Sequence, residues 1–142
     1  MRISLIKVKI LEFGTDLHIT KEDIEKISPQ ITYITSNADI EALALVSREG
    51  YQIAFSALPE YHVDGDQFSG LASALLMTGR STMEQLFHES LNEVIVRGRD
   101  GYIVVTNAER LVIVCAGTKI KTLMKTVSVM RVAAKKIMKI FD

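Results

Sequence analysis

The feature that most constrains the fold is a turn pattern that occurs twice. Arg48-Glu49-Gly50-Tyr51 and Arg99-Asp100-Gly101-Tyr102 each place a charged pair before a glycine and a tyrosine after it. Strand-like apolar runs flank both turns, and glycine supplies the positive φ that a tight hairpin needs. The sequence therefore predicts two antiparallel hairpins, over residues 40–56 and 93–106. A third reversal at residues 107–110 leads into another buried strand over residues 111–116.

Helical periodicity separates these strands. Lys21 to Asn37 is expected to form one kinked helix or two short ones, because Thr20 can cap a first start and Ser28-Pro29 resembles a second. Between the hairpins, Asp64 can cap a long helix, with Gln67 as its capping-box partner. The apolar stripe expected on this middle helix comprises Phe68, Leu71, Ala72, Leu75, Gly79, Thr82, Met83 and Leu86.

A last helix is expected from near Lys119 to the end of the chain. Its apolar stripe would comprise Ile120, Leu123, Met124, Val127, Ala134, Ile137 and Phe141. The resulting order is helix, two strands, helix, three strands, helix, which predicts an α+β domain with an antiparallel sheet. Residues 3–11 also alternate with a period of two and could add a strand near the N-terminus.

Composition argues against several classes of protein. The formal net charge of the 142 residues is zero, so the chain as a whole has no electrostatic case for binding nucleic acid or membrane. The single cysteine, Cys115, lies in an apolar run and is expected to be a buried structural residue. Without a disulfide, a signal-peptide pattern or a membrane-spanning stretch, the chain is expected to be cytoplasmic.

Motifs for catalysis, cofactors and metals are not found in the sequence. The segment Gly79-Arg80-Ser81-Thr82 resembles the end of a P-loop but has arginine in place of lysine and no strand before it. The histidines lack metal-ligand spacing, and no serine lies in a nucleophile elbow. We therefore expect no catalytic residue, no cofactor and no metal. An enzyme with a dispersed site ranks last among the alternatives.

Two helix faces have unusual composition. The last helix carries seven bases from Lys119 onward and one acid, Asp142. This pattern indicates a solvated face, or else contact with anionic lipid, nucleic acid or an acidic partner. The middle helix has small residues and one methionine opposite its apolar stripe, which favours a protein interface. The residues of this predicted partner face are Gly70, Ser73, Ala74, Met77, Arg80, Ser81 and Glu84.

Three segments carry a family resemblance. Leu43 to Ala54, Phe68 to Leu86 and Asn92 to Tyr102 resemble the first hairpin, the central helix and the second hairpin of the Roadblock family. That family includes dynein light chains of the Roadblock type and prokaryotic regulators of Ras-like GTPases. The similarity covers residues 28–141, so we expect a Roadblock-type domain at 28–142 preceded by an N-terminal extension at 1–27.

The resemblance implies a fold and a function. The fold would be longin/profilin-like, with a five-stranded antiparallel sheet of order 2-1-5-4-3, the central helix on one face and the terminal helices on the other. The function would be that of a non-enzymatic homodimeric scaffold that binds a Ras-like small GTPase, with no nucleic acid and at most indirect membrane contact. The alternative is a module that uses its basic last helix on anionic lipid or nucleic acid. The dimer would form through the central helix and the third strand, Glu93, Val94, Ile95, Val96 and Arg97.

Overall fold

The computed structural model describes residues 19–141, so the strand expected within residues 3–11 lies outside the described residues. The elements follow the expected order along the chain. They are α1 (Lys21–Asn37), β1 (Ala42–Ser47), β2 (Gln52–Ala57), α2 (Gly65–Phe87), β3 (Glu93–Arg97), β4 (Tyr102–Ala108), β5 (Leu111–Gly117), the 3-10 turn η2 (Ile120–Thr122) and α3 (Leu123–Ile140).

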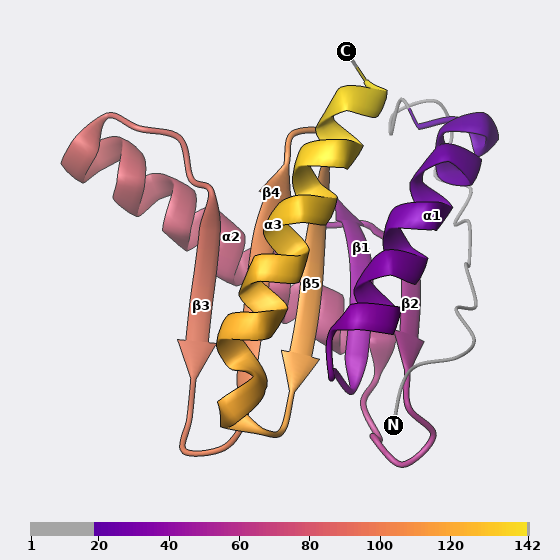
Figure 1. The fold of residues 1–142 in the computed structure, drawn as a ribbon. Helices are drawn as coiled ribbons and strands as arrows, with labels where there is room; N and C mark the ends of the chain where they lie inside the picture. Colours follow the sequence, from indigo (N-terminus) through magenta and orange to yellow (C-terminus); the bar gives the residue numbers. More distant parts are fainter. Residues whose placement is uncertain (1–18, 142) are drawn as a thin grey trace.

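The sheet has five strands in the order β2-β1-β5-β4-β3, and every neighbouring pair is antiparallel. Helices α1 and α3 lie together on one face, and α2 crosses the other face diagonally (Figure 1). The predicted α+β architecture and the strand order 2-1-5-4-3 are therefore confirmed. The strand order came from the family resemblance, whereas the hairpins followed from the turn residues.

Strands buried on both sides explain the unbroken apolar runs in the sequence. Successive side chains of a strand point to opposite faces, so Val104 joins the core under α1 and α3 while Val105 joins the core under α2. Ile113 and Val112 divide in the same way on β5. Cys115 is fully buried in the α1 and α3 core, as predicted.

Helix α1 is a single helix although Pro29 lies inside it. Thr20 and Asp23 form a capping box, with the Thr20 amide donating to Asp23 Oδ2 at 2.9 Å and the Asp23 amide donating to Thr20 Oγ1 at 3.1 Å. The Ser28 hydroxyl donates to the Ile24 carbonyl oxygen at 3.1 Å, so Ser28 does not cap a second helix. The predicted domain boundary between residues 27 and 28 falls within this helix, whose buried side chains start at Ile24.

The turns differ in a way that the sequence did not distinguish. Gly50 has a φ of 98°, as the hairpin signature predicts. Gly101 is not among the described residues with positive φ, so the expected left-handed glycine in the second turn is wrong. The third reversal instead uses Glu109 at a φ of 68°, where Asn107 Oδ1 accepts a hydrogen bond from the Glu109 amide at 3.1 Å.

The predicted apolar stripe of α2 is partly wrong. Its buried apolar side chains are Phe68, Ala72 and Leu76, which repeat every four residues. The Phe68 ring packs edge-on against the Phe55 ring, with 5.7 Å between the ring centres. This ridge turns the helix so that Leu71 is exposed. The predicted stripe members Thr82 and Leu86 are exposed too. Met124, expected in the stripe of α3, is also exposed. Asp64 does cap α2, but through the amide of Asp66 at 2.9 Å instead of a box with Gln67.

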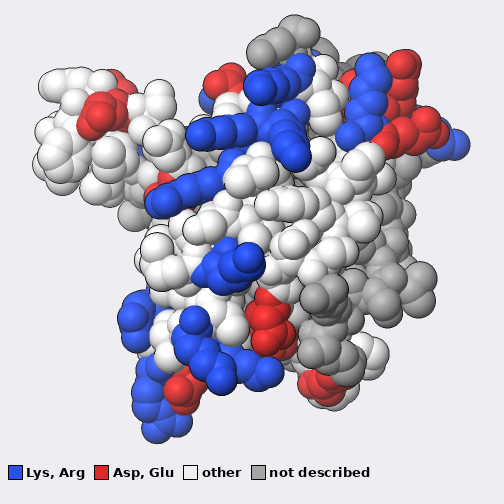
Figure 2. Space-filling model, viewed as in Figure 1, with Lys and Arg blue, Asp and Glu red and all other residues white. Residues whose placement is uncertain are grey.

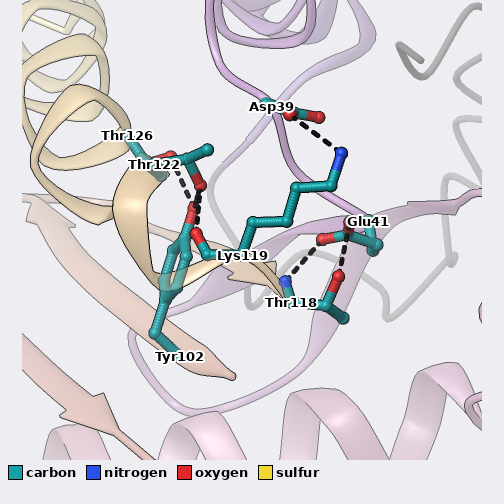
Figure 3. Close-up of polar contacts among 7 residues, drawn as sticks. All are labelled: Asp39, Glu41, Tyr102, Thr118, Lys119, Thr122 and Thr126. Atoms are coloured by element: carbon teal, nitrogen blue, oxygen red, sulfur yellow. Dashed lines mark hydrogen bonds and ion pairs between the residues drawn. The ribbon is translucent and has the colours of Figure 1, made fainter. Parts of the chain in front are cut away.

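The start of α3 is attached to the sheet by buried and bridging polar contacts (Figure 3). The Tyr102 hydroxyl lies 2.7 Å from Thr122 Oγ1 and 2.8 Å from Thr126 Oγ1. Glu41 accepts two hydrogen bonds from Thr118, at 2.8 Å from its amide and 2.9 Å from its hydroxyl. These contacts fix η2 and the first turn of α3 against β4 and β1.

Gly117 tests this arrangement, because a Cβ at that position would overlap the Tyr102 ring. We expect Gly117→Ala to lower the free energy of unfolding by about 1–3 kcal/mol, since the ring must shift and its hydrogen bonds with it. Gly70→Ala is the matched control, because a Cβ there meets nothing within 4 Å. In the α2 interior it should raise stability by about 0.5–1 kcal/mol. Urea unfolding of both variants measures this, and a Gly117→Ala protein as stable as wild type would contradict the role given to Tyr102.

Candidate interaction surfaces

Strand β3 is an edge of the sheet, and in the described chain it pairs only with β4. The hydrogen bonds at the two ends of β3 show which of its backbone groups are free to pair with another strand. Gly98 donates to the Gly101 carbonyl at 2.7 Å, and Asn107 donates to the Asn92 carbonyl at 2.9 Å. Because N–H and C=O groups alternate in direction along an antiparallel strand, even-numbered residues face β4. The backbone groups of Glu93, Ile95 and Arg97 therefore point outward along the open edge.

The side chains of β3 divide between the two faces of the sheet. Glu93 lies on the α3 side, where it accepts hydrogen bonds from Arg131, and Ile95 and Arg97 share this side by alternation. Val94 packs into the α2 core, where a Cβ on Gly79 would overlap it. Gly79 thus permits close approach of α2 to β3. Ile95 and Val96 are 39% and 43% exposed, which is high for β-branched side chains in a sheet.

The predicted partner face of α2 is only partly a single surface. Five of its seven residues are exposed, namely Gly70, Ala74, Met77, Ser81 and Glu84. The other two face the β1–β2 turn. A Cβ on Gly50 would overlap the Ser73 hydroxyl, and Arg80 Nη1 donates to the Arg48 carbonyl at 3.4 Å.

The C-terminal end of α2 projects beyond the sheet (Figure 1). At 1.5 Å per residue, the 23 residues of α2 extend about 35 Å, whereas five strands spaced about 4.8 Å apart span about 20 Å. Leu86 and Phe87 lie in the projecting turn, and both are more than half exposed. This surface was not predicted from the sequence, where Leu86 was expected in the apolar stripe facing the sheet. The length of the helical segment was the available signal.

A cleft of about 550 Å³ lies beneath this projection. Arg80 faces it, and burial together with the nearby Arg48 lowers the pKa of the Arg80 guanidinium. Glu84, Glu89 and Glu109 supply opposite charge around it. The lining has neither a cysteine nor a histidine, so it lacks the usual pairing of a nucleophile with a base.

Groups with catalytic potential are few in the described residues. Burial raises the pKa of the Cys115 thiol far above its ordinary range, which keeps it in the unreactive protonated form. Between residues 19 and 141, no group of three or more His, Cys, Asp or Glu side chains could hold a metal ion. The helices of this part of the chain are too short or too polar to cross a bilayer.

Comparison with known proteins gives the family. The model of the Roadblock/LC7 domain matches residues 31–116, and the chain belongs to this family of regulatory, non-catalytic domains. No curated protein matches the chain in sequence. Individual proteins are therefore compared with this chain by their structures.

Three solved structures share the fold over most of their length. MglB from Myxococcus xanthus has a TM-score of 0.74 at 19% identity, covering 87% of this chain and 92% of that one. An MglB in a tetrameric arrangement has a TM-score of 0.72 at 15% identity, covering 86% and 92%. The gliding protein MglB from Thermus thermophilus has a TM-score of 0.72 at 14% identity, covering 86% and 93%. At these identities the likeness establishes the fold alone.

Proposed function

We propose that this chain is a non-enzymatic, cytoplasmic homodimer that acts as a scaffold or regulator of a Ras-like small GTPase. The observation that carries the proposal is the coincidence of an open edge strand with exposed apolar side chains on and beside it. Ile95 and Val96 lie on β3, and Leu86 and Phe87 lie on the projecting end of α2. Such an edge invites aggregation unless a second chain covers it.

The sequence of β3 is suited to pairing with itself. When two copies of Glu93-Val94-Ile95-Val96-Arg97 run antiparallel about a two-fold axis at Ile95, Glu93 faces Arg97 of the second copy. Opposite charges directly across two strands are favourable. The outward backbone groups of Glu93, Ile95 and Arg97 are the ones this register requires, since each opposed pair can exchange both N–H···O bonds. A shift by one residue would misalign both the charges and the backbone groups.

The same two-fold axis would bring the second copy over the exposed end of α2. Pairing β3 with β3 makes one continuous sheet, so both α2 helices lie on one side of it and both α3 helices on the other. Leu86 and Phe87 project past β3 and would lie over the neighbouring copy. Burying an apolar side chain of this size contributes about 1.5–3 kcal/mol, which is a large gain for a small interface.

The outward face of α2 is the proposed surface for the GTPase. Gly70, Ala74 and Ser81 are small and exposed, so a partner backbone can approach closely there. Met77 adds an adaptable apolar contact at the centre of this group. Members of the family resembled by the sequence regulate Ras-like GTPases, which supports this class of partner.

Affinity capture of binding proteins from the cytosol of the native cells tests whether the partner is a Ras-like GTPase. The immobilised protein is exposed to cytosol loaded with GTP or with GDP, and bound proteins are identified by mass spectrometry. We expect a Ras-like GTPase to be enriched, with the amount depending on the nucleotide, because such partners change conformation between the two states. Capture of no GTPase in either state would contradict the proposed function.

A further inference from the structure

The outer face of α3 carries a concentration of positive charge that the zero net charge conceals. Lys119 through Ile140 contains seven bases and no acid. Three of the bases have described partners. Lys119 pairs with Asp39 at 3.5 Å, Arg131 pairs with Glu93, and Lys136 lies 5.4 Å from the centre of the Tyr33 ring. Within residues 19–141, no acidic side chain pairs with the remaining four, which are Lys121, Lys125, Lys135 and Lys139.

Apolar side chains lie among these lysines. Met124 and Val132 are both exposed although each belongs to an apolar residue type. Helical spacing places them on the same outward surface as Lys125 and Lys135. Figure 2 shows Lys and Arg side chains spaced along α3 with uncharged surface between them. An ordinary solvated helix mixes acids with bases, so this face is not explained by solvation alone.

From this composition we propose that the outer face of α3 docks on the surface of an anionic phospholipid membrane. Lysine heads can reach lipid phosphates while their long aliphatic stems and the Met124 side chain enter the headgroup region. Nucleic acid fits less well, because an exposed aromatic side chain for base stacking is lacking on α3. This surface lies on the opposite side of the sheet from α2, so docking would leave the proposed GTPase surface open.

Dimerisation would strengthen the contact, a step that rests on the proposed function. In the register about Ile95, both α3 faces lie on one side of the continuous sheet and can meet a flat surface together. The hydrogen bonds that join the Tyr102 hydroxyl to the hydroxyls of Thr122 and Thr126 hold the start of each α3 against the sheet (Figure 3). Each lysine near an anionic leaflet strengthens binding about fivefold.

Vesicle co-sedimentation tests the proposal on the whole chain. The variant is Lys125→Gln/Lys135→Gln/Lys139→Gln, and the control Lys21→Gln/Lys26→Gln/Arg48→Gln removes three charges elsewhere. We expect wild type to bind vesicles of phosphatidylcholine with phosphatidylglycerol and not vesicles of phosphatidylcholine alone. The α3 variant should bind about a hundredfold more weakly and the control within a few fold of wild type. Circular dichroism establishes that both remain folded.

Several results would overturn the membrane assignment. These are no binding to anionic vesicles, equal binding to neutral ones, or equal loss in the two triple variants. A duplex oligonucleotide that binds more tightly than vesicles, and is lost in the α3 variant, would make the face a nucleic-acid surface instead. The proposed dimer is judged separately by mass. The protein could prove to be a monomer whose vesicle binding still requires anionic lipid and the three lysines. That result would support the membrane inference and contradict only the proposed dimer.

Discussion

We expect Ile95→Glu to convert the proposed dimer to a monomer, with the dimer dissociation constant raised about a thousandfold or more. Two glutamates would face each other at the two-fold axis with Cβ atoms about 4.5–5.5 Å apart. Their repulsion adds to the lost burial of two isoleucines and to the cost of desolvating unpaired charges. Together these terms reach about 4 kcal/mol, which corresponds to the thousandfold change. Sedimentation equilibrium over a range of concentrations measures it.

Val132→Glu is the matched control for this variant. Val132 is 40% exposed and Ile95 is 39% exposed, so the two substitutions introduce the same charge at similarly open β-branched positions. Val132 is an exposed residue of α3 and not of β3, so its variant should keep the dimer mass of wild type. Circular dichroism should show the wild-type helix and strand content in both proteins. An Ile95→Glu protein with the dimer mass would show that β3 is not the contact between copies.

Met77→Glu is expected to weaken binding of the GTPase about a hundredfold. Met77 lies at the centre of the small-residue face of α2, and a carboxylate buried there without a partner costs about 2–5 kcal/mol. The fold should survive, because Met77 is 66% exposed and the buried ridge of α2 is untouched. Quantitative pull-down against the nucleotide-loaded GTPase measures the loss.

Met124→Glu provides the control, since Met124 is 62% exposed on the opposite side of the sheet. This variant should retain capture. If Met77→Glu captures the GTPase as well as wild type does, the partner binds elsewhere. If it loses both the GTPase and the dimer mass, α2 supports both contacts. Loss of the helical signal in circular dichroism would mean that Met77 belongs to the core.

The strands and their order were predictable for different reasons. A hairpin depends on a few adjacent residues, so Gly50 and Tyr51 were sufficient to predict the first one. The order of the strands depends on contacts far apart in the sequence, and only the family resemblance supplied it. Turn geometry does not follow from the turn residues alone, because two similar turns can adopt different backbone conformations. Gly101 follows a charged pair just as Gly50 does, yet only Gly50 has positive φ.

The orientation of α2 could not be obtained from periodicity alone. Phe68, Ala72 and Leu76 form the buried ridge, but Leu71 and Leu75 gave an equally regular apolar stripe in the sequence. Which stripe faces the sheet depends on where Phe55 meets the helix. Leu86 lies near the sheet-facing side of the helix and is exposed only because the helix outruns the sheet.

The basic composition of the last helix could be counted in the sequence, but the sequence did not show which of its cations are paired with acids. Counting residues shows that the last helix is basic, and this alone left solvation as the favoured interpretation. The structure adds which cations have partners. Arg131 and Lys119 are paired with acids from other elements, whereas Lys125, Lys135 and Lys139 have no such partner among the described residues.

In the proposed dimer, Ile95 of one copy lies opposite Ile95 of the second copy. The most direct measurement is native mass spectrometry of Ile95→Glu and Ile95→Lys, each alone and mixed in equal amounts. We predict that each variant alone is monomeric, because it places like charges opposite each other. The mixture should form a heterodimer, because glutamate then faces lysine. Homodimers of either variant alone, or a mixture that stays monomeric, would contradict this register and the account of β3 that depends on it.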